Sequence, residues 1–93
     1  MIEAIKNAFP EFKVMEGEER EIVLRKGNNK AVLGYSFTPR GKIYLYVKEV
    51  NGEKVKRRGT RGTFPSLSPF SVRRHISWML KDAGFLREVS DEN

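Results

Sequence analysis

Strand-like segments fill the middle of the chain. Apolar and polar residues alternate there, which is the period of a strand with one buried face. The segments that fit this pattern lie at 12–16, 21–26, 30–38, 42–50 and 53–58. Turn residues separate them, and Asn51-Gly52 is the strongest hairpin signal because both residue types tolerate positive φ. The spacing of the turns predicts an antiparallel meander of four or five strands.

Helical periodicity is confined to the two ends. The segment 2–9 has one apolar stripe and ends at Pro10. The second helix begins with Ser68 as N-cap and Pro69 in the first helical position, and Gly84 ends it. Its apolar stripe consists of Val72, Ile76, Met79, Leu80 and Ala83. The pattern predicts an α+β fold: a short N-terminal helix, the meander, and a longer C-terminal helix packed on one face of the sheet.

Size and composition limit the remaining possibilities. The 93 residues predict a single domain over 1–89, with a loose tail at 90–93. The chain has no cysteine, which excludes disulfides and thiolate metal sites. The N-terminal segment lacks the basic start and apolar stretch of a secretory signal, and no run of apolar residues is long enough to span a membrane. We therefore expect a soluble, cytoplasmic protein with no membrane partner.

Few residues are suited to catalysis. The only histidine is His75, whose helical neighbour is Ser71, and the nearest acids follow at Asp82 and Glu88. No base and orienting acid surround a nucleophile, so we expect a half-buried structural histidine and no enzyme activity. The glutamates between 16 and 21 have the character of a solvated turn rather than a metal site. Neither a catalytic residue nor a metal or cofactor is predicted.

Charge is distributed unevenly along the chain. The net charge of +6 arises from −3 over residues 1–23, +11 over 24–74 and −2 over 75–93. The segment 53–62, "EKVKRRGTRG", alone holds five of the 18 Lys and Arg residues. A basic centre between acidic ends indicates a positive surface that faces a polyanion.

The strand at 42–50 gives this surface a chemistry. Its alternation puts Lys42, Tyr44, Tyr46 and Lys48 on one face and the aliphatic Ile43, Leu45 and Val47 on the other. We expect the helices to cover the aliphatic face, which leaves tyrosines to stack on bases and lysines to meet phosphates. Tyr35 and Phe37 alternate in the same way and extend this platform in the same interpretation. The alternative is that the tyrosine rings cover a second small core.

The returning strand adds further cations at the edge of the same surface. Lys54, Lys56 and Arg58 share one of its faces, Arg57 lies on the other, and Arg61 is expected in the loop that follows. Lysines on an edge strand also prevent aggregation, but that role needs only one or two charges. The predicted nucleic-acid site consists of Arg40, Lys42, Tyr44, Tyr46, Lys48, Lys54, Lys56, Arg57, Arg58, Arg61, Arg73 and Arg74.

Two stretches resemble known families. "SPFSVRRHISWMLKDAGFLREV" resembles the recognition-helix region of winged helix-turn-helix regulators, although the segment before it cannot form the preceding helix. A longer stretch, from Gly41 to Ile76, is similar to the positive-cofactor-four family of single-stranded-DNA-binding coactivators. Its "GK" strand, "GE" with a basic return strand, and Leu67-Ser68-Pro69 before a helix carry that resemblance. The N-terminal helix and the inserted "TRGTFP" depart from the family.

The second resemblance implies a curved antiparallel sheet that binds single strands and a helix that forms a homodimer. With the surface pattern, it favours a non-catalytic protein that binds single-stranded DNA or RNA. One alternative is a duplex-DNA-binding transcription regulator that uses Arg73, Arg74 and His75. Another is a small interaction or inhibitor protein that docks on an acidic partner.

Overall fold

The computed structural model describes residues 2–55, 61–64 and 68–85, and for 61–64 it describes the backbone alone. In these described residues the order along the chain is one helix, six strands and a second helix. They are α1 (Ile2–Ala8), β1 (Lys13–Glu16), β2 (Glu21–Lys26), β3 (Asn29–Phe37), β4 (Ile43–Val50), β5 (Glu53–Lys54), β6 (Arg61–Phe64) and α2 (Pro69–Asp82). The predicted order of elements is confirmed.

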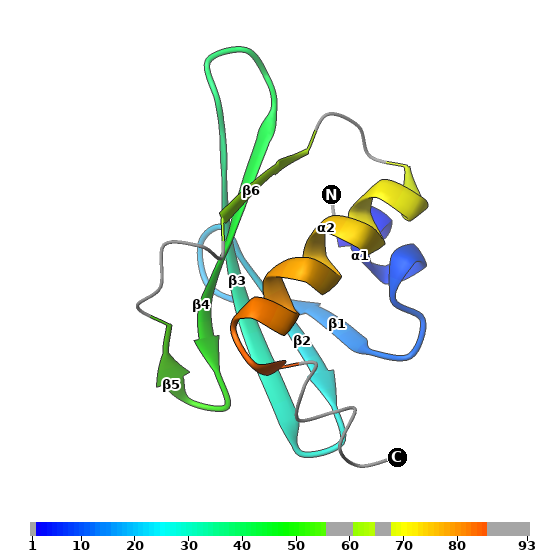
Figure 1. Cartoon of the computed structure of the whole chain (residues 1–93), viewed down its shortest axis with the longest axis vertical. Helices are drawn as coiled ribbons and strands as arrows, with labels where there is room; N and C mark the ends of the chain where they lie inside the picture. The colour runs from blue at the N-terminus through cyan, green and yellow to red at the C-terminus, as the bar shows by residue number, and fades with distance from the viewer. Residues whose placement is uncertain (1, 56–60, 65–67, 86–93) are drawn as a thin grey trace.

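All strand pairs in the sheet are antiparallel. The strands β1 to β4 pair in chain order, and β3 and β4 form its long central hairpin (Figure 1). The remaining edge of β4 pairs with β5 at one end and with β6 at the other. Two short strands therefore share the fifth position, so the sheet is an open meander five positions wide.

The turn at Asn51 and Gly52 has the predicted geometry. Both residues have positive φ, 51° and 85°, which are the values of a tight hairpin turn. Asparagine tolerates this region and glycine adopts it without steric cost. The turn links β4 directly to β5, where Val50 pairs with Glu53.

The limits of α2 are also those that the sequence predicts. The Ser68 hydroxyl accepts a hydrogen bond from the Ser71 N–H at 3.3 Å, which caps the first turn. At the other end, the N–H of Gly84 donates to the Lys81 carbonyl at 3.0 Å. A capped helix of this length can present its whole apolar stripe to the core.

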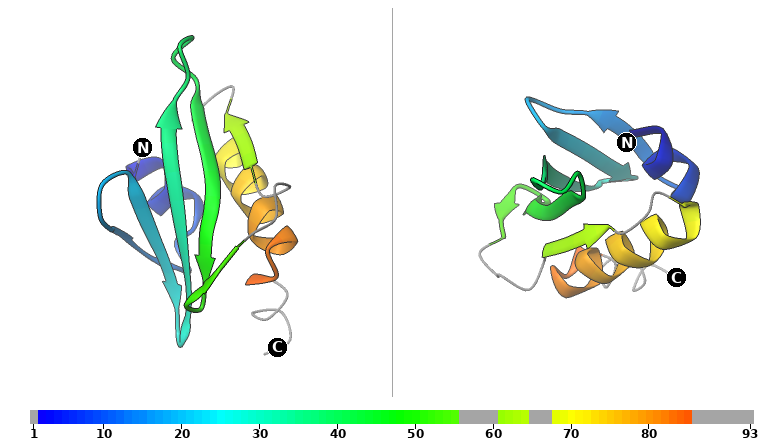
Figure 2. Two further views of the ribbon diagram at one scale, coloured as in Figure 1. Left: turned by 90° about the vertical axis from the view of Figure 1, so that its left-hand side faces the viewer. Right: turned by 90° about the horizontal axis from the view of Figure 1, so that it is seen from above.

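Both helices pack on the same face of the sheet. In the left view of Figure 2 the strands face the viewer and the helices lie behind them. The core contains aliphatic residues of β2, β3 and β4, the α2 residues Val72, Ile76, Met79 and Leu80, and a group of phenylalanines. The ring of Phe12 lies 5.3 Å from that of Phe9 and 5.9 Å from that of Phe85, between centroids. The packing confirms that the aliphatic face of β4 is the one that the helices cover.

The structure corrects the prediction for the edge strand. A continuous strand over 53–58 was expected, but β5 ends at Lys54, and residues 56–58 lie outside the described part. Arg61 was expected in a loop, yet Arg61–Phe64 forms β6. Pairing with residues 43–46 explains it, because the free edge of β4 offers backbone partners whatever the local propensity. The predicted tail at 90–93 also lies outside the described residues.

Among the described helices, none has the length and apolar character needed to cross a membrane. The longer helix, α2, has 14 residues and carries charges on its outer side.

Candidate nucleic-acid interface

The face of the sheet opposite the helices carries Tyr44 and Tyr46. Cross-strand register places Tyr44 beside Ser36 and Tyr46 beside Gly34, and paired residues point to the same side of a sheet. The two rings lie 6.4 Å apart between centroids, inclined by 44°, and both residues are half-buried. The predicted pair of tyrosines therefore lies on the face that neither helix covers, which we call the open face.

Gly34 determines where the Tyr46 ring lies. A Cβ atom added to Gly34 would come within 2.5 Å of Tyr46 Cζ, closer than real Cβ contacts allow. The outer part of the ring therefore lies over Gly34, an approach that only glycine permits. The sequence indicated the tyrosine but not this glycine, although a glycine inside a strand pattern is a signal of such an approach.

Lys48 lies on the open face, as predicted, but it has a partner. Its ammonium group forms an ion pair with the Glu21 carboxylate of β2. That hydrogen bond lowers the pKa of Glu21 and raises the pKa of Lys48. The pair leaves Lys48 a weaker attractor for phosphate than its exposure alone indicates.

Other predicted cations lie toward the two ends of β4 and form no such ion pair in the described chain. Arg40 and Lys42 are exposed at the end of the β3–β4 hairpin, and Lys54 is exposed on β5. Among the described residues, none of the three takes part in an ion pair. Arg61 pairs with Tyr46 along the backbone, and its side chain is not described. The rest of the predicted basic run, Lys56, Arg57 and Arg58, lies outside the described part of the chain.

The open face also has a row of cations that the sequence analysis missed. Register places Lys13 opposite Arg25, and Arg25 opposite Lys30, across β1, β2 and β3. In the part of the chain that the structure describes, these three residues make no ion pair. Alternation within a single strand can place each of these cations on the polar face. That they lie side by side follows only from the register between the strands.

Tyr35 and Phe37 are a correction. They were expected to extend the tyrosine platform, but register pairs Tyr35 with Leu45 and Phe37 with Ile43, on the helix-covered side. Tyr35 packs against the core, and its ring meets that of Phe37 edge-on at 6.1 Å. Phe37 is 61% exposed at the end of the hairpin.

Arg73 is tied to the loop that follows α1. Its guanidinium donates to both Glu11 carboxylate oxygens, at 3.0 and 2.6 Å, and to the Ala8 carbonyl at 2.7 Å. It also lies 4.9 Å from the centroid of the Phe9 ring, a cation–π contact. The hydrogen bond from Arg73 lowers the pKa of Glu11. The structure thus separates Arg73 from the tyrosines and gives it a role in holding α1 against α2.

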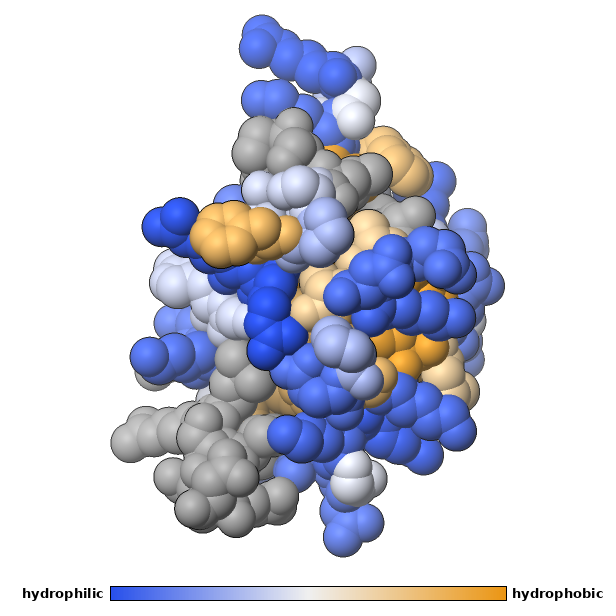
Figure 3. Space-filling model, turned by 90° about the vertical axis from the view of Figure 1, so that its right-hand side faces the viewer, coloured by the Kyte–Doolittle hydropathy of each residue, from blue (hydrophilic) through white to orange (hydrophobic). Residues whose placement is uncertain are grey.

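The neighbouring Arg74 is exposed on α2. Phe70 and Trp78, one helical repeat before and after it, are 75% and 57% exposed. Arg74 and Trp78 line a cavity of about 190 Å³ together with His75, which is half-buried as predicted. Figure 3 views the side of the helices and shows hydrophobic surface in separate patches between hydrophilic side chains.

The described carboxylates form no metal-binding cluster. Among the described residues, no group of three or more His, Cys, Asp or Glu residues is close enough to hold a metal ion. Of the glutamates near the β1–β2 turn, Glu21 instead pairs with Lys48.

Comparisons with protein-family models, with curated proteins and with solved structures give no match for this chain. The resemblance to the positive-cofactor-four family therefore stays a prediction, and so does the winged-helix resemblance. The functional interpretation depends on the geometry of the open face.

Proposed function

We propose that this protein binds single-stranded DNA or RNA on the open face of its sheet, without catalysis. One observation carries the proposal: two adjacent tyrosine rings lie on a sheet face that neither α1 nor α2 covers, and except for Lys48 the described cations of that face form no ion pair with a described carboxylate. The same strand turns its aliphatic residues toward the core. The aromatic side is thus left for a ligand.

The chemistry of this face suits an unpaired strand better than a duplex. Each base that stacks on an aromatic ring contributes about 1–3 kcal/mol, and any base offers such a ring face. Bases in a duplex stack on each other and expose only their edges. Cations on either side of the rings meet phosphates, a contribution that weakens as salt rises.

The duplex-binding alternative depends on α2 and has less support. Arg73 would have to break its contacts with Glu11 and Ala8 to reach a groove. A docking role for α2 on an acidic protein is the second candidate, because exposed Phe70 and Trp78 flank the cationic Arg74. Aromatic residues with arginine are typical of protein interfaces.

Fluorescence anisotropy with labelled single-stranded DNA, RNA and duplex tests the proposal. The variant Tyr44→Leu/Tyr46→Leu keeps apolar volume but loses both stacking surfaces. We expect it to lose about 2 kcal/mol or more of single-strand binding, roughly thirtyfold, while duplex binding changes less. The matched control is Tyr35→Leu, the remaining tyrosine, which lies on the covered face.

A thermal melt shows whether each variant is folded. A folded double variant that binds single strands as tightly as the parent would overturn the proposal. Arg74→Ala tests the alternative interface. A larger loss of nucleic-acid affinity in this variant than in the double tyrosine variant would assign the interface to α2.

A further inference from the structure

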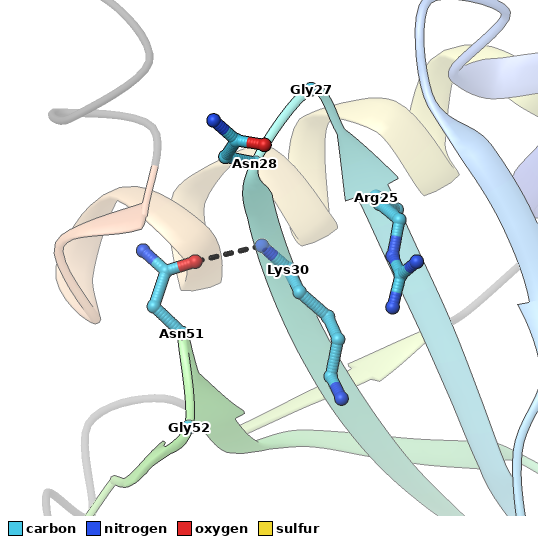
Figure 4. Close-up of a pocket in the computed structure, with 6 residues that line it drawn as sticks. All are labelled: Arg25, Gly27, Asn28, Lys30, Asn51 and Gly52. Carbon is cyan, nitrogen blue, oxygen red and sulfur yellow. Dashed lines mark hydrogen bonds between the residues drawn. The ribbon is translucent and has the colours of Figure 1, made fainter.

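A cavity of about 350 Å³ opens between two turns that are far apart in the sequence. The β2–β3 turn contributes Gly27 and Asn28, and the β4–β5 turn contributes Asn51 and Gly52. Arg25 and Lys30 complete its lining from the adjoining strands. Figure 4 shows these two side chains extending side by side along β2 and β3, with helical ribbon behind the sheet. The cavity therefore opens on the same side as the tyrosines.

Asn51 holds the two turns together. Its side-chain oxygen accepts a hydrogen bond from the Lys30 N–H at 2.8 Å, and its own N–H donates to the Lys30 carbonyl at 2.7 Å. Its carboxamide nitrogen also donates to Asn29 Oδ1 at 3.3 Å. Because these bonds tie one turn to the other, the walls of the cavity are formed before any ligand arrives.

The cavity concentrates positive charge. Arg25 and Lys30 occupy directly opposite positions on β2 and β3, and like charges in such a pair destabilise a sheet. Lys13 lies opposite Arg25 on β1 and extends the row. No carboxylate in the described chain forms an ion pair with any of them. An anionic group in the cavity would remove this repulsion, and arginine with lysine is a favourable pair of donors for phosphate.

We infer that this cavity binds a phosphate group, held by Arg25 and Lys30. If the proposed function holds, on which this step rests, the group is a backbone phosphate of the strand that stacks on Tyr44 and Tyr46. Lys30 and Gly34 are four residues apart on β3, about 13 Å at about 3.3 Å per residue. A dinucleotide has a single phosphate between its two nucleosides, close to the stacked bases. A dinucleotide on the tyrosines cannot also reach the cavity, whereas a longer strand can.

The first test uses inorganic pyrophosphate and isotope-labelled protein. We expect pyrophosphate to shift the backbone amide resonances of residues 27–30 and 51–52, and the variant Arg25→Gln/Lys30→Gln to lose those shifts. The control is Lys26→Gln, which removes a charge from the same turn but from the alternate side of β2. Absence of the shifts in the parent protein, or equal loss in the control, would overturn the inference.

The second test measures binding of oligothymidylates by anisotropy. For a strand of about twelve nucleotides, within the site sizes of single-strand-binding sheets, Arg25→Gln/Lys30→Gln should weaken binding about tenfold at low salt. It should also reduce the slope of log affinity against log salt by about 0.7, because one phosphate is no longer neutralised. Lys26→Gln should change neither quantity as much, and binding of a dinucleotide should be insensitive to the double variant. Equal affinities of parent and double variant for the longer strand would overturn the backbone-phosphate assignment.

The two tests fail separately. A parent protein that binds no nucleic acid but shows the pyrophosphate shifts would refute the proposed function and support the phosphate site. A parent that binds single strands through the tyrosines, with no response at residues 27–30, would support the function and refute the site. Circular dichroism of the variants shows whether the sheet is retained. The single variant Arg25→Lys, which keeps the charge, should retain most of the pyrophosphate response that the double variant loses.

Discussion

The two faces of the sheet are built from the same strands and differ in almost every property. On the covered face Leu24, Leu33 and Leu45 have no exposed surface. On the open face the neighbouring positions hold two half-buried tyrosines, an ion pair and a row of cations. Burial of the covered face supplies most of the stability, so the open face can carry repelling charges without unfolding the domain. The comparison indicates that charged and aromatic side chains on the open face cost little stability, because the domain depends mainly on burial of the covered face.

The largest expected effect comes from the covered face. Leu45→Ala removes a fully buried side chain at the centre of β4 and leaves a cavity, so it should lower the free energy of unfolding by about 2–5 kcal/mol. Met15→Ala is the matched change on the open face, where the side chain is 44% exposed, and should cost much less. Urea denaturation measures both, and similar losses would mean that both faces are core.

Gly34→Ala should damage the open face specifically. The new Cβ would collide with the Tyr46 ring, which must then move, at a cost of about 1–3 kcal/mol. In a Tyr46→Ala background the collision is absent, so the same substitution should cost far less. A double-mutant cycle from urea denaturation measures this coupling. Additive losses would show that the ring does not lie over Gly34.

A comparison of adjacent arginines on α2 sharpens the contrast between structural and free charge. Arg73→Ala breaks the contacts to Glu11 and Ala8, and because both side chains are partly exposed, solvent screening limits the loss to about 1 kcal/mol. Arg74→Ala should lie within about 0.5 kcal/mol of the parent. Thermal melts distinguish the two, and equal melting temperatures would deny Arg73 its structural role.

The smallest effect is a pH dependence. The pKa of Glu11 is lowered in the folded state, chiefly by the hydrogen bond from Arg73, and the pKa of Glu21 is lowered by Lys48. A carboxylate with a lowered folded pKa adds stability above its ordinary pKa, and that stability is lost as pH falls through the folded value. Glu11→Gln should flatten part of the decline in unfolding free energy below about pH 4.5. An unchanged acid profile would contradict this origin.

Local patterns predicted most of the fold. The N-cap at Ser68, the stripe along α2 and the hairpin at Asn51-Gly52 each depend on residues close in sequence, and each is confirmed. The edge of the sheet was mispredicted because β6 depends on a free edge of β4, which no local propensity reveals.

The site was predicted only in part, for a related reason. The alternation of a strand shows which of its residues share a face. The register between strands decides whether those residues lie on the same face of the sheet as the residues of the next strand. Tyr35 was therefore assigned to the wrong side, and the row of Lys13, Arg25 and Lys30 was missed. The partner of Arg73 lies 62 residues away, beyond the reach of any helical or strand pattern.

An amide chemical-shift map with oligothymidylate tests most directly whether the open face is the binding surface. Titration of isotope-labelled protein should produce the largest shifts at Gly34, Ser36 and residues 44–46, with little change along α2. Shifts concentrated between Phe70 and Trp78 would contradict the assignment to the sheet. If no amide resonance shifts even at a large molar excess of oligothymidylate, the protein does not bind single strands, and the proposed function is contradicted.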